Sequence, residues 1–159
     1  LVEIKALFES AQIKSTELNR IVLTDGPGSY TGLRIGMTVA KVLGALAHVE
    51  VYTLSSLHVL AGLKKNVHVL LDARAKRAYY AHFHEGIPLI NERIVLLSDF
   101  DDLDVSTLNI IGDGNLVNKD KYYSDYTKHF MDLEGYWKKV DNIHALVPRY
   151  LKENEAYQP

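Results

Sequence analysis

The chain has 159 residues, 47% of them hydrophobic, which is enough to form a buried core in one or two small domains. Its formal net charge is −2, and the 18 lysines and arginines are scattered, so no basic stripe indicates direct binding to nucleic acid. The absence of cysteine excludes disulfides and thiolate metal sites, and no apolar run approaches the roughly 20 residues that a membrane span requires. We therefore expect a compact cytoplasmic protein that makes no membrane contact.

The first 24 residues predict a helix followed by a strand. In the segment LVEIKALFESA, Leu1, Ile4 and Phe8 recur at helical spacing, and Leu7 extends the same face. After a polar connection, the segment RIVLT at residues 20–24 has the pattern of a short buried strand. Because the chain begins inside the predicted helix, we expect that preceding residues of the protein are missing.

A cluster of turn-forming residues, DGPGS, follows this strand at residues 25–29. It precedes a helix that we expect from about Thr31 to Ala47. The hydroxyl of Ser29 or of Thr31 can cap the free amide groups at the start of this helix.

A strand, a glycine-rich turn and a helix start could also form a phosphate site. A Walker loop requires lysine and a hydroxyl residue after its second glycine, whereas Leu33 and Arg34 follow Gly32. A dinucleotide site is not indicated either, because the only nearby acid, Glu50, stands at the start of the next strand and not at its end. We therefore expect the glycines of the turn to allow a tight bend.

The remainder of the chain predicts more strands than helices. In order, we expect a strand at 50–54, a short helix from Ser55 or Ser56, strands at 67–72, 77–84, 89–97 and 108–111, and a terminal helix at 143–151. The links between the strands of 67–97 are short, as antiparallel hairpins need. The aromatic-rich segment 122–137 is not assigned.

The two halves of the chain, which we divide into 1–62 and 63–159, suggest an internal duplication. The second half has a three-strand meander followed by further elements, whereas the first has only helix, strand, helix and strand. If both halves share one plan, about 40 residues carrying three strands are missing from the N-terminus.

Small residues recur every four positions in the second predicted helix, at Gly32, Gly36, Ala40 and Gly44. Each glycine costs about 0.5–1 kcal/mol relative to alanine inside a helix, so a compensating contact is expected. A ridge of small residues lets another helix approach closely, and apolar area beside it would come from Leu33, Met37, Val42 and Leu43. The first helix could lie there, or the contact could belong to another subunit.

Arg34 stands in the first turn of this helix, where a cation faces the positive end of the helix dipole. It should therefore have an anionic partner. Asp25 could supply that charge within the chain, or an acidic residue of a partner protein could supply it.

The seven histidines do not form an evident metal site. His82 and His84 share a strand face, but no third ligand lies near them in the sequence. His58 has no second histidine four positions away, and no serine lies in a Gly-x-Ser-x-Gly turn. We expect no catalytic set, no metal and no cofactor in this chain.

The segment from residue 25 to residue 61, DGPGSYTGLRIGMTVAKVLGALAHVEVYTLSSLHVLA, resembles the signature region of the TsaB (YeaZ) family. The resemblance continues in LLDARAKRAYYAHF and IGDG, and more faintly in the closing LVPRYLKE, so it covers most of the chain. TsaB proteins open with a strand bearing an Asp-Thr-Ser-like motif and two further strands. Those strands correspond to the meander that the first half lacks.

The resemblance implies an α/β, actin-like (ASKHA) fold of two RNase H-like halves, the first incomplete. It also implies descent shared with TsaD, the catalytic subunit that makes threonylcarbamoyladenosine in tRNA. TsaD-type proteins carry a metal-binding His-x-x-x-His pair after the strand that matches residues 49–53, and this chain keeps only His58 there. A single histidine cannot replace a chelating pair, so metal binding and transfer are expected in the partner.

The partners that the resemblance implies are TsaD in a heterodimer, the ATPase TsaE in a larger complex, tRNA only through that complex, and a homodimer when TsaD is absent. TsaD would be bound through the first two helices. The expected interface residues are Leu1, Ile4, Phe8, Gly32, Leu33, Arg34, Gly36, Met37, Ala40 and Gly44. The chain would then be a non-catalytic scaffold. The alternative is an enzyme, either a degenerate ASKHA ATPase or a glycoprotease-like metallopeptidase.

Overall fold

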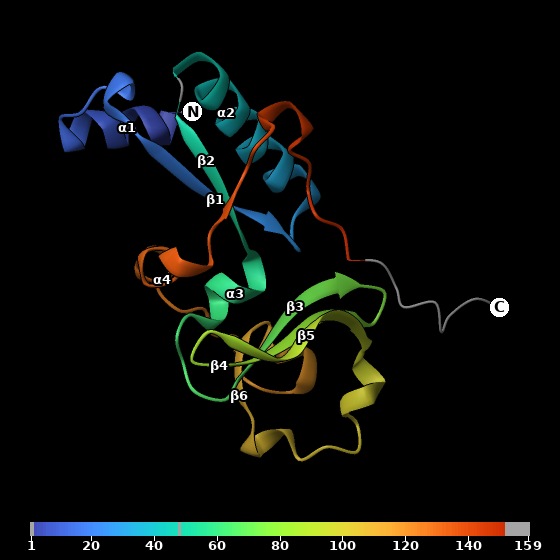
Figure 1. Ribbon diagram of the computed structural model, residues 1–159. Helices are drawn as coiled ribbons and strands as arrows, with labels where there is room; N and C mark the ends of the chain where they lie inside the picture. The colour runs from blue at the N-terminus through green and yellow to red at the C-terminus, as the bar shows by residue number, and fades with distance from the viewer. Residues whose placement is uncertain (1, 48, 152–159) are drawn as a thin grey trace.

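The computed structural model describes residues 2–47 and 49–151, which form two α/β units built on two separate sheets (Figure 1). The strand order is β1-β2-β7 in the first sheet and β5-β4-β3-β6 in the second. The helices are α1 (Val2–Ala11), α2 (Tyr30–Ala47), α3 (Ser56–Ala61) and α4 (Tyr126–Asp132). The strands are β1 (Arg20–Gly26), β2 (Glu50–Ser55), β3 (Val67–Arg74), β4 (Arg77–His84), β5 (Ile87–Leu96), β6 (Asn109–Gly112) and β7 (Lys138–Lys139), and short 3-10 turns join several of them.

The first unit is a parallel β1–β2 pair crossed by α2, as the sequence predicts. Ile21 lies opposite Val51 in this pair. The Oγ atom of Ser29 accepts a hydrogen bond from the amide of Gly32 at 3.3 Å, which confirms that Ser29 caps α2. The helix packs on the sheet through Met37, and the small core beneath it includes Val51.

The second unit confirms the predicted meander. Strands β3, β4 and β5 pair antiparallel in sequence order, and β6 pairs parallel to β3. Its main core is apolar and fully enclosed, because Val67, Val69 and Ala81 have no exposed surface. The short, well-patterned strands and tight links explain why this unit could be predicted from local sequence.

Helix α3 lies between the two units (Figure 1). The Oγ atom of Ser55 caps it by accepting from the amides of Leu57 and His58. Leu57 packs into the core of the second unit, whereas Val59 packs into a cluster with Leu54 of β2. This helix therefore belongs to both cores and joins them.

The last part of the chain returns to the first unit. Strand β7 pairs antiparallel with β2, and Leu133 at the end of α4 packs beside Leu54. The proposed division into 1–62 and 63–159 is thus crossed by the C-terminal segment. The predicted helix at 143–151 is wrong: only a 3-10 turn at Ile143–Ala145 forms, because Pro148 disfavours helix at the preceding residue and lacks a donor.

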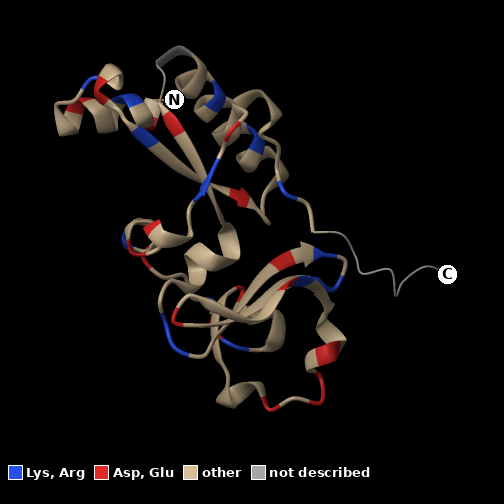
Figure 2. Cartoon of the chain, in the orientation of Figure 1, with Lys and Arg blue, Asp and Glu red and all other residues tan. Residues whose placement is uncertain are grey.

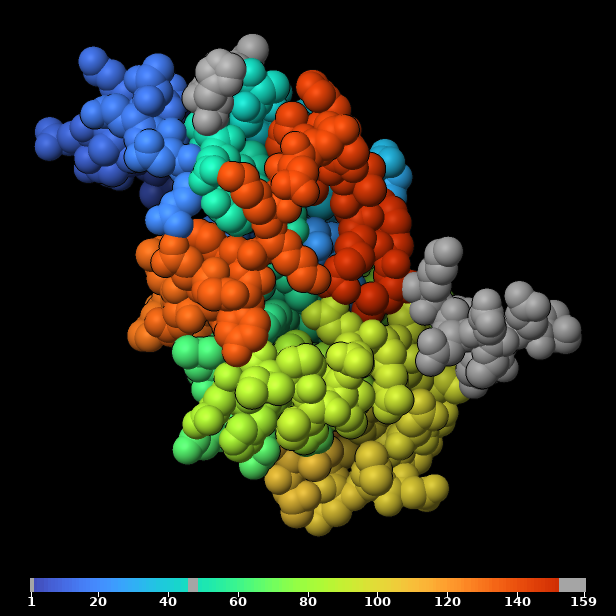
Figure 3. All heavy atoms as spheres, in the orientation of Figure 1, coloured from blue at the N-terminus to red at the C-terminus, as the bar shows by residue number. Residues whose placement is uncertain are grey.

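Helix α1 stands apart from the rest of the first unit, where it projects from the body (Figures 1 and 3). It forms where the sequence predicts it, and none of its described residues is buried. Within the described residues, no helix is long and apolar enough to cross a membrane.

Candidate partner surface and interdomain cleft

The row of small residues in α2 faces two different environments. Nothing lies within 4 Å of the position that a Cβ atom on Gly36 would take, and Gly32 meets only its capping Ser29. By contrast, Ala40 is 2% exposed, and a Cβ on Gly44 would lie 3.0 Å from Val51. The N-terminal part of the row, Gly32 and Gly36, is therefore exposed, whereas the C-terminal part, Ala40 and Gly44, packs against this chain's own sheet.

The expected interface residues of α2 are likewise partly buried in this chain and partly exposed. Met37 is buried in the core of the first unit, and Leu33 is half-buried next to Gly26. Ile35 was not among the expected residues, whereas Val42 was expected beside the ridge, and the two side chains are 61% and 50% exposed. Together with Gly36, they give α2 an apolar outer face.

Arg34 does not pair with Asp25, the internal one of the two anionic partners expected for it. Its guanidinium carbon lies 4.6 Å from the centre of the Tyr30 ring, one helical turn earlier. Asp25 instead pairs with Arg149. The π face of Tyr30 compensates part of the unfavourable position of Arg34 near the helix start.

Helix α1 offers a second surface of the same kind. Ile4 and Phe8 are half-buried in a shallow hollow of about 450 Å³ against the loop that follows the helix. Val2 and Leu7 are 80% and 66% exposed. Leu1, also expected at the interface, lies outside the described residues.

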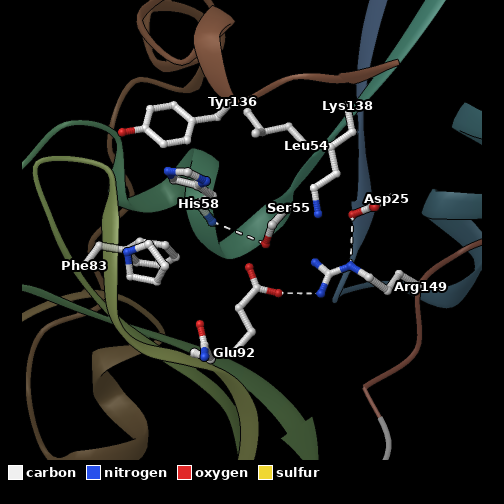
Figure 4. A pocket seen from close by; sticks show the side chains of 11 residues that line it. Asp25, Leu54, Ser55, His58, Phe83, Glu92, Tyr136, Lys138 and Arg149 are labelled. Carbon is white, nitrogen blue, oxygen red and sulfur yellow. Dashed lines mark hydrogen bonds and ion pairs between the residues drawn. The ribbon is translucent and has the colours of Figure 1, made fainter. Parts of the chain in front are cut away.

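A cavity of about 390 Å³ lies between the two units, beside α3 (Figure 4). Asp25 and Ser55 reach it from the carboxyl ends of β1 and β2, and Glu92 reaches it from β5. Crevices at the carboxyl ends of parallel strands are common ligand sites. Here, Arg149 of the C-terminal segment extends into the crevice between the acidic residues.

Two acids and two cations, Asp25 and Glu92 with Lys138 and Arg149, line this cleft. Arg149 lies 3.4 Å from Asp25 (Nε to Oδ1) and 2.6 Å from Glu92 (Nη1 to Oε2). Burial raises the pKa of Asp25 although Arg149 opposes the shift. Burial alone would lower the pKa of Arg149, but the two carboxylates raise it above its ordinary value. The guanidinium is therefore a fixed cation between two acids.

His58 is 9% exposed and forms the inner wall of the cleft. Its ring stacks on Phe83 with centroids 4.9 Å apart and meets the edge of Tyr136 at 4.7 Å. Burial lowers its pKa, so the ring is neutral at physiological pH. Within residues 2–47 and 49–151, no group of three His, Asp or Glu side chains is placed to hold a metal ion.

The histidines of the second sheet have structural partners. His68 and His82 stack across β3 and β4 with ring centroids 4.0 Å apart, and His68 Nδ1 lies 2.9 Å from the Tyr80 hydroxyl. Burial, followed by repulsion from His82, lowers the pKa of His68 to about 4. His84 Nδ1 lies 2.8 Å from Asn66 Oδ1, whereas His82 stacks on His68, so the two histidines of β4 have different partners.

A second polar cluster surrounds Asp113, the first residue after β6. This carboxylate accepts from the Tyr123 hydroxyl at 2.6 Å and from the amide of Asp72 at 2.9 Å, and Lys121 lies 2.8 Å away. Burial would raise the pKa of Asp113, but these donors outweigh it and lower the pKa. Asp72 in turn accepts from the amide of Arg74 at 2.7 Å and so caps the turn between β3 and β4.

Sequence reasoning missed the principal residues of the cleft, Glu92, Tyr136 and Arg149. Arg149 and Asp25 are 124 positions apart, so no local pattern links them. Basic and acidic residues are interspersed over both units (Figure 2).

The two units are joined at α3 over a central cleft; the first is a parallel pair crossed by α2, and the second is an antiparallel meander with a parallel fourth strand. This is an actin-like (ASKHA) fold of two RNase H-like halves, of which the first shows no meander within the described residues. Two solved structures from Pseudomonas aeruginosa share it. YeaZ matches with a TM-score of 0.70 and 19% identity over 93% of this chain and 82% of its own. A protein described as similar to peptidase YEAZ matches with a TM-score of 0.69 and 18% identity over 94% and 81%.

Sequence comparison identifies the family. The family model of TsaD, tRNA N6-adenosine threonylcarbamoyltransferase, matches residues 1–133. The Bacillus subtilis tRNA threonylcarbamoyladenosine biosynthesis protein TsaB is 25% identical over 96% of this chain and 78% of its own length. The chain therefore belongs to the TsaD family as that model defines it, and within it to the TsaB (YeaZ) group.

Other relatives match a shorter stretch. An uncharacterized protein of Mycobacterium bovis is 31% identical over 60% of this chain, and the match spans 46% of that relative. The TsaB protein of Buchnera aphidicola subsp. Schizaphis graminum is 28% identical over 50% of this chain and 41% of its own length.

Proposed function

We propose that this chain is a non-catalytic cytoplasmic subunit in the synthesis of threonylcarbamoyladenosine in tRNA, where it binds and stabilises a TsaD partner. Membership of the TsaB group supports the pathway, since relatives in that group are named for it. The scattered charges support contact with tRNA only through the complex.

The observation that carries the partner proposal is the exposed, apolar helix α1. A helix of 10 residues is marginal in water on its own, and α1 has no buried residue to hold it in place. Packing against another protein would bury Leu7, Phe8 and neighbouring side chains and stabilise the helix. The open part of α2, at Gly36 and Ile35, would supply the second contact.

The non-catalytic role rests on the contents of the cleft. Arg149 occupies the space between Asp25 and Glu92, and His58 is a neutral ring enclosed by aromatic side chains. The turn before α2 lacks the lysine of a phosphate-binding loop. TsaE would join the TsaD complex, and without TsaD the same helices could form a homodimer.

The test is co-elution of this chain with TsaD of the same organism in size-exclusion chromatography, followed by an assay of tRNA modification with and without the chain. We expect a complex and modification that depends on it. Gly36→Leu should weaken the complex at least tenfold, because the new side chain stands on the contact face. Gly135→Leu is the matched control, since its Cβ position also has nothing within 4 Å.

Two outcomes would contradict this proposal in different ways. No co-elution would remove the scaffold role, and an intact complex with Gly36→Leu would move the interface away from α2. Hydrolysis of ATP or of a peptide by the purified chain alone would instead support the alternative function, a degenerate ASKHA ATPase or a glycoprotease-like metallopeptidase.

A further inference from the structure

The C-terminal strap, residues 146–150, crosses the first unit and reaches the second. Leu146 is buried in the core under α2, and Pro148 is buried beside it. Tyr150 stacks on Tyr30 at the start of α2, with ring centroids 5.9 Å apart. The strap is thus anchored on both sides of Arg149.

Arg149 is tied to the end of β1 by main-chain and side-chain bonds. Its amide donates to the carbonyl of Asp25 at 2.8 Å, and Nη2 donates to the carbonyl of Gly26 at 2.9 Å. The carbonyl oxygen of Arg149 lies only 2.7 Å from where a Cβ of Gly26 would stand. The first glycine of the DGPGS turn therefore makes room for the strap, a use that the sequence pattern did not indicate.

The same guanidinium reaches across the cleft to the second unit. Nη1 lies 2.6 Å from Glu92 of β5, whose side chain is only 15% exposed, and Nε faces Asp25, whose side chain is 16% exposed. Ion pairs with so little exposure are screened less than surface pairs. Arg149 therefore links the two units on the side of the cavity opposite α3.

We propose that Arg149 is a latch which holds the two units closed over the central cavity, and that its release lets them open about α3. Helix α3 packs in both cores and remains the joint when the latch opens. Glu92 is the carboxylate of the second unit to which Arg149 binds. The strap and Asp25 position the guanidinium. This proposal does not require that the chain binds TsaD.

Distances between spin labels on the two units test the latch directly. The chain has no cysteine, so Val42→Cys on α2 and Ser98→Cys after β5 give a single labelled pair at exposed positions. Pulsed electron–electron double resonance on the isolated full chain, diluted with unlabelled chain so that only distances within one molecule are measured, should give one narrow distance. Arg149→Ala should add a population at a different, broader distance, and Glu92→Gln, which keeps the side-chain shape, should do the same to a smaller extent.

Arg93→Ala is the matched control, because Arg93 is the exposed neighbour of Glu92 and should leave the distance unchanged. Arg149→Lys keeps one charge without the forked geometry and should give an intermediate population. Distributions for Arg149→Ala and Glu92→Gln that superpose on the unmodified chain would overturn the proposal. If Arg149→Ala does not fold, Glu92→Gln alone decides.

Discussion

His68 and His82 form a stacked pair whose burial favours the neutral form of both rings. The rings lie 4.0 Å apart on the face of the second sheet, and the buried Nε2 atom of His82 has no protein hydrogen-bond partner. Burial lowers the pKa of both histidines, that of His68 to about 4. Protonation of either ring would place a charge against its neighbour in a poorly solvated position.

The protein should therefore lose stability as the pH falls. An unfolded histidine binds a proton near pH 6.5, whereas folded His68 binds one only near pH 4, so between these values the unfolded state takes up more protons. The free energy of unfolding should fall by about 1–2 kcal/mol between pH 7 and pH 5. Urea denaturation at several pH values measures this fall in the free energy of unfolding.

His68→Gln should reduce this fall, because the variant cannot be protonated at that position. His144→Gln is the control, because His144 is exposed and lies in the C-terminal segment of the first unit. Equal pH dependence in the His68→Gln variant and the unmodified protein would show that the stacked pair does not set it.

The ionic partners of single residues were the least predictable feature. Arg34 and Asp25 are close in sequence, and a helix-start cation near an acid is a reasonable local pair. The side chain of Asp25 instead bonds Arg149, and Arg34 lies over Tyr30. Which cation pairs with a given carboxylate depends on which distant segment the fold brings next to it. The spacing of residues in the sequence does not contain that information.

The elements themselves followed from local patterns where those patterns were strong. Helices α1 and α2 and the strands β1–β6 lie close to their expected positions. The signals that predict them, the spacing of apolar residues and the turn-forming residues, involve only a few neighbouring positions. The predicted terminal helix at 143–151 does not form because of Pro148. Helix α4 and the two-residue strand β7 were not predicted from the sequence. The end of α4 packs against apolar side chains of β2 and α3, and β7 pairs with β2, and these partners are far away in the sequence.

Helix α2 shows why a four-residue spacing does not define one face. Four residues turn an α-helix by about 400°, so each step drifts by about 40° and three steps by about 120°. Gly36 consequently faces open space, while Gly44 faces Val51 and Ile143 of the first unit. The row of small residues serves internal packing at one end and is free at the other.

The two glycines should respond in opposite ways to larger side chains. Gly36→Ala should raise the free energy of unfolding by about 0.5–1 kcal/mol, because alanine favours helix and meets nothing there. Gly44→Leu should lower it by about 1–3 kcal/mol, because Val51 and Ile143 already stand within 3.0–3.3 Å of the new Cβ. Urea denaturation followed by circular dichroism measures both. Similar stabilities for the two variants would mean that α2 can shift away from the sheet.

Across the whole molecule, the two units differ in how completely they are enclosed. In the second unit, Val67, Val69 and Leu70 of β3 have no exposed surface, and β3 lies between two strands. In the first unit, residues 21–25 of β1 are only half-buried, and within the described residues β1 pairs with β2 alone. Because local opening is easiest where apolar burial is least, the first unit should open more readily.

Hydrogen exchange of the isolated chain, followed by mass spectrometry, should resolve this difference. Amides of β3, residues 67–74, should exchange more slowly than those of β1, residues 20–26, by about tenfold or more, the factor that corresponds to about 1.4 kcal/mol in opening free energy. The two strands have similar lengths, so they serve as an internal comparison. Equal protection would mean that α3 and the strap couple the units into a single cooperative structure, and Arg149→Ala should then restore the difference by releasing the strap from the second unit.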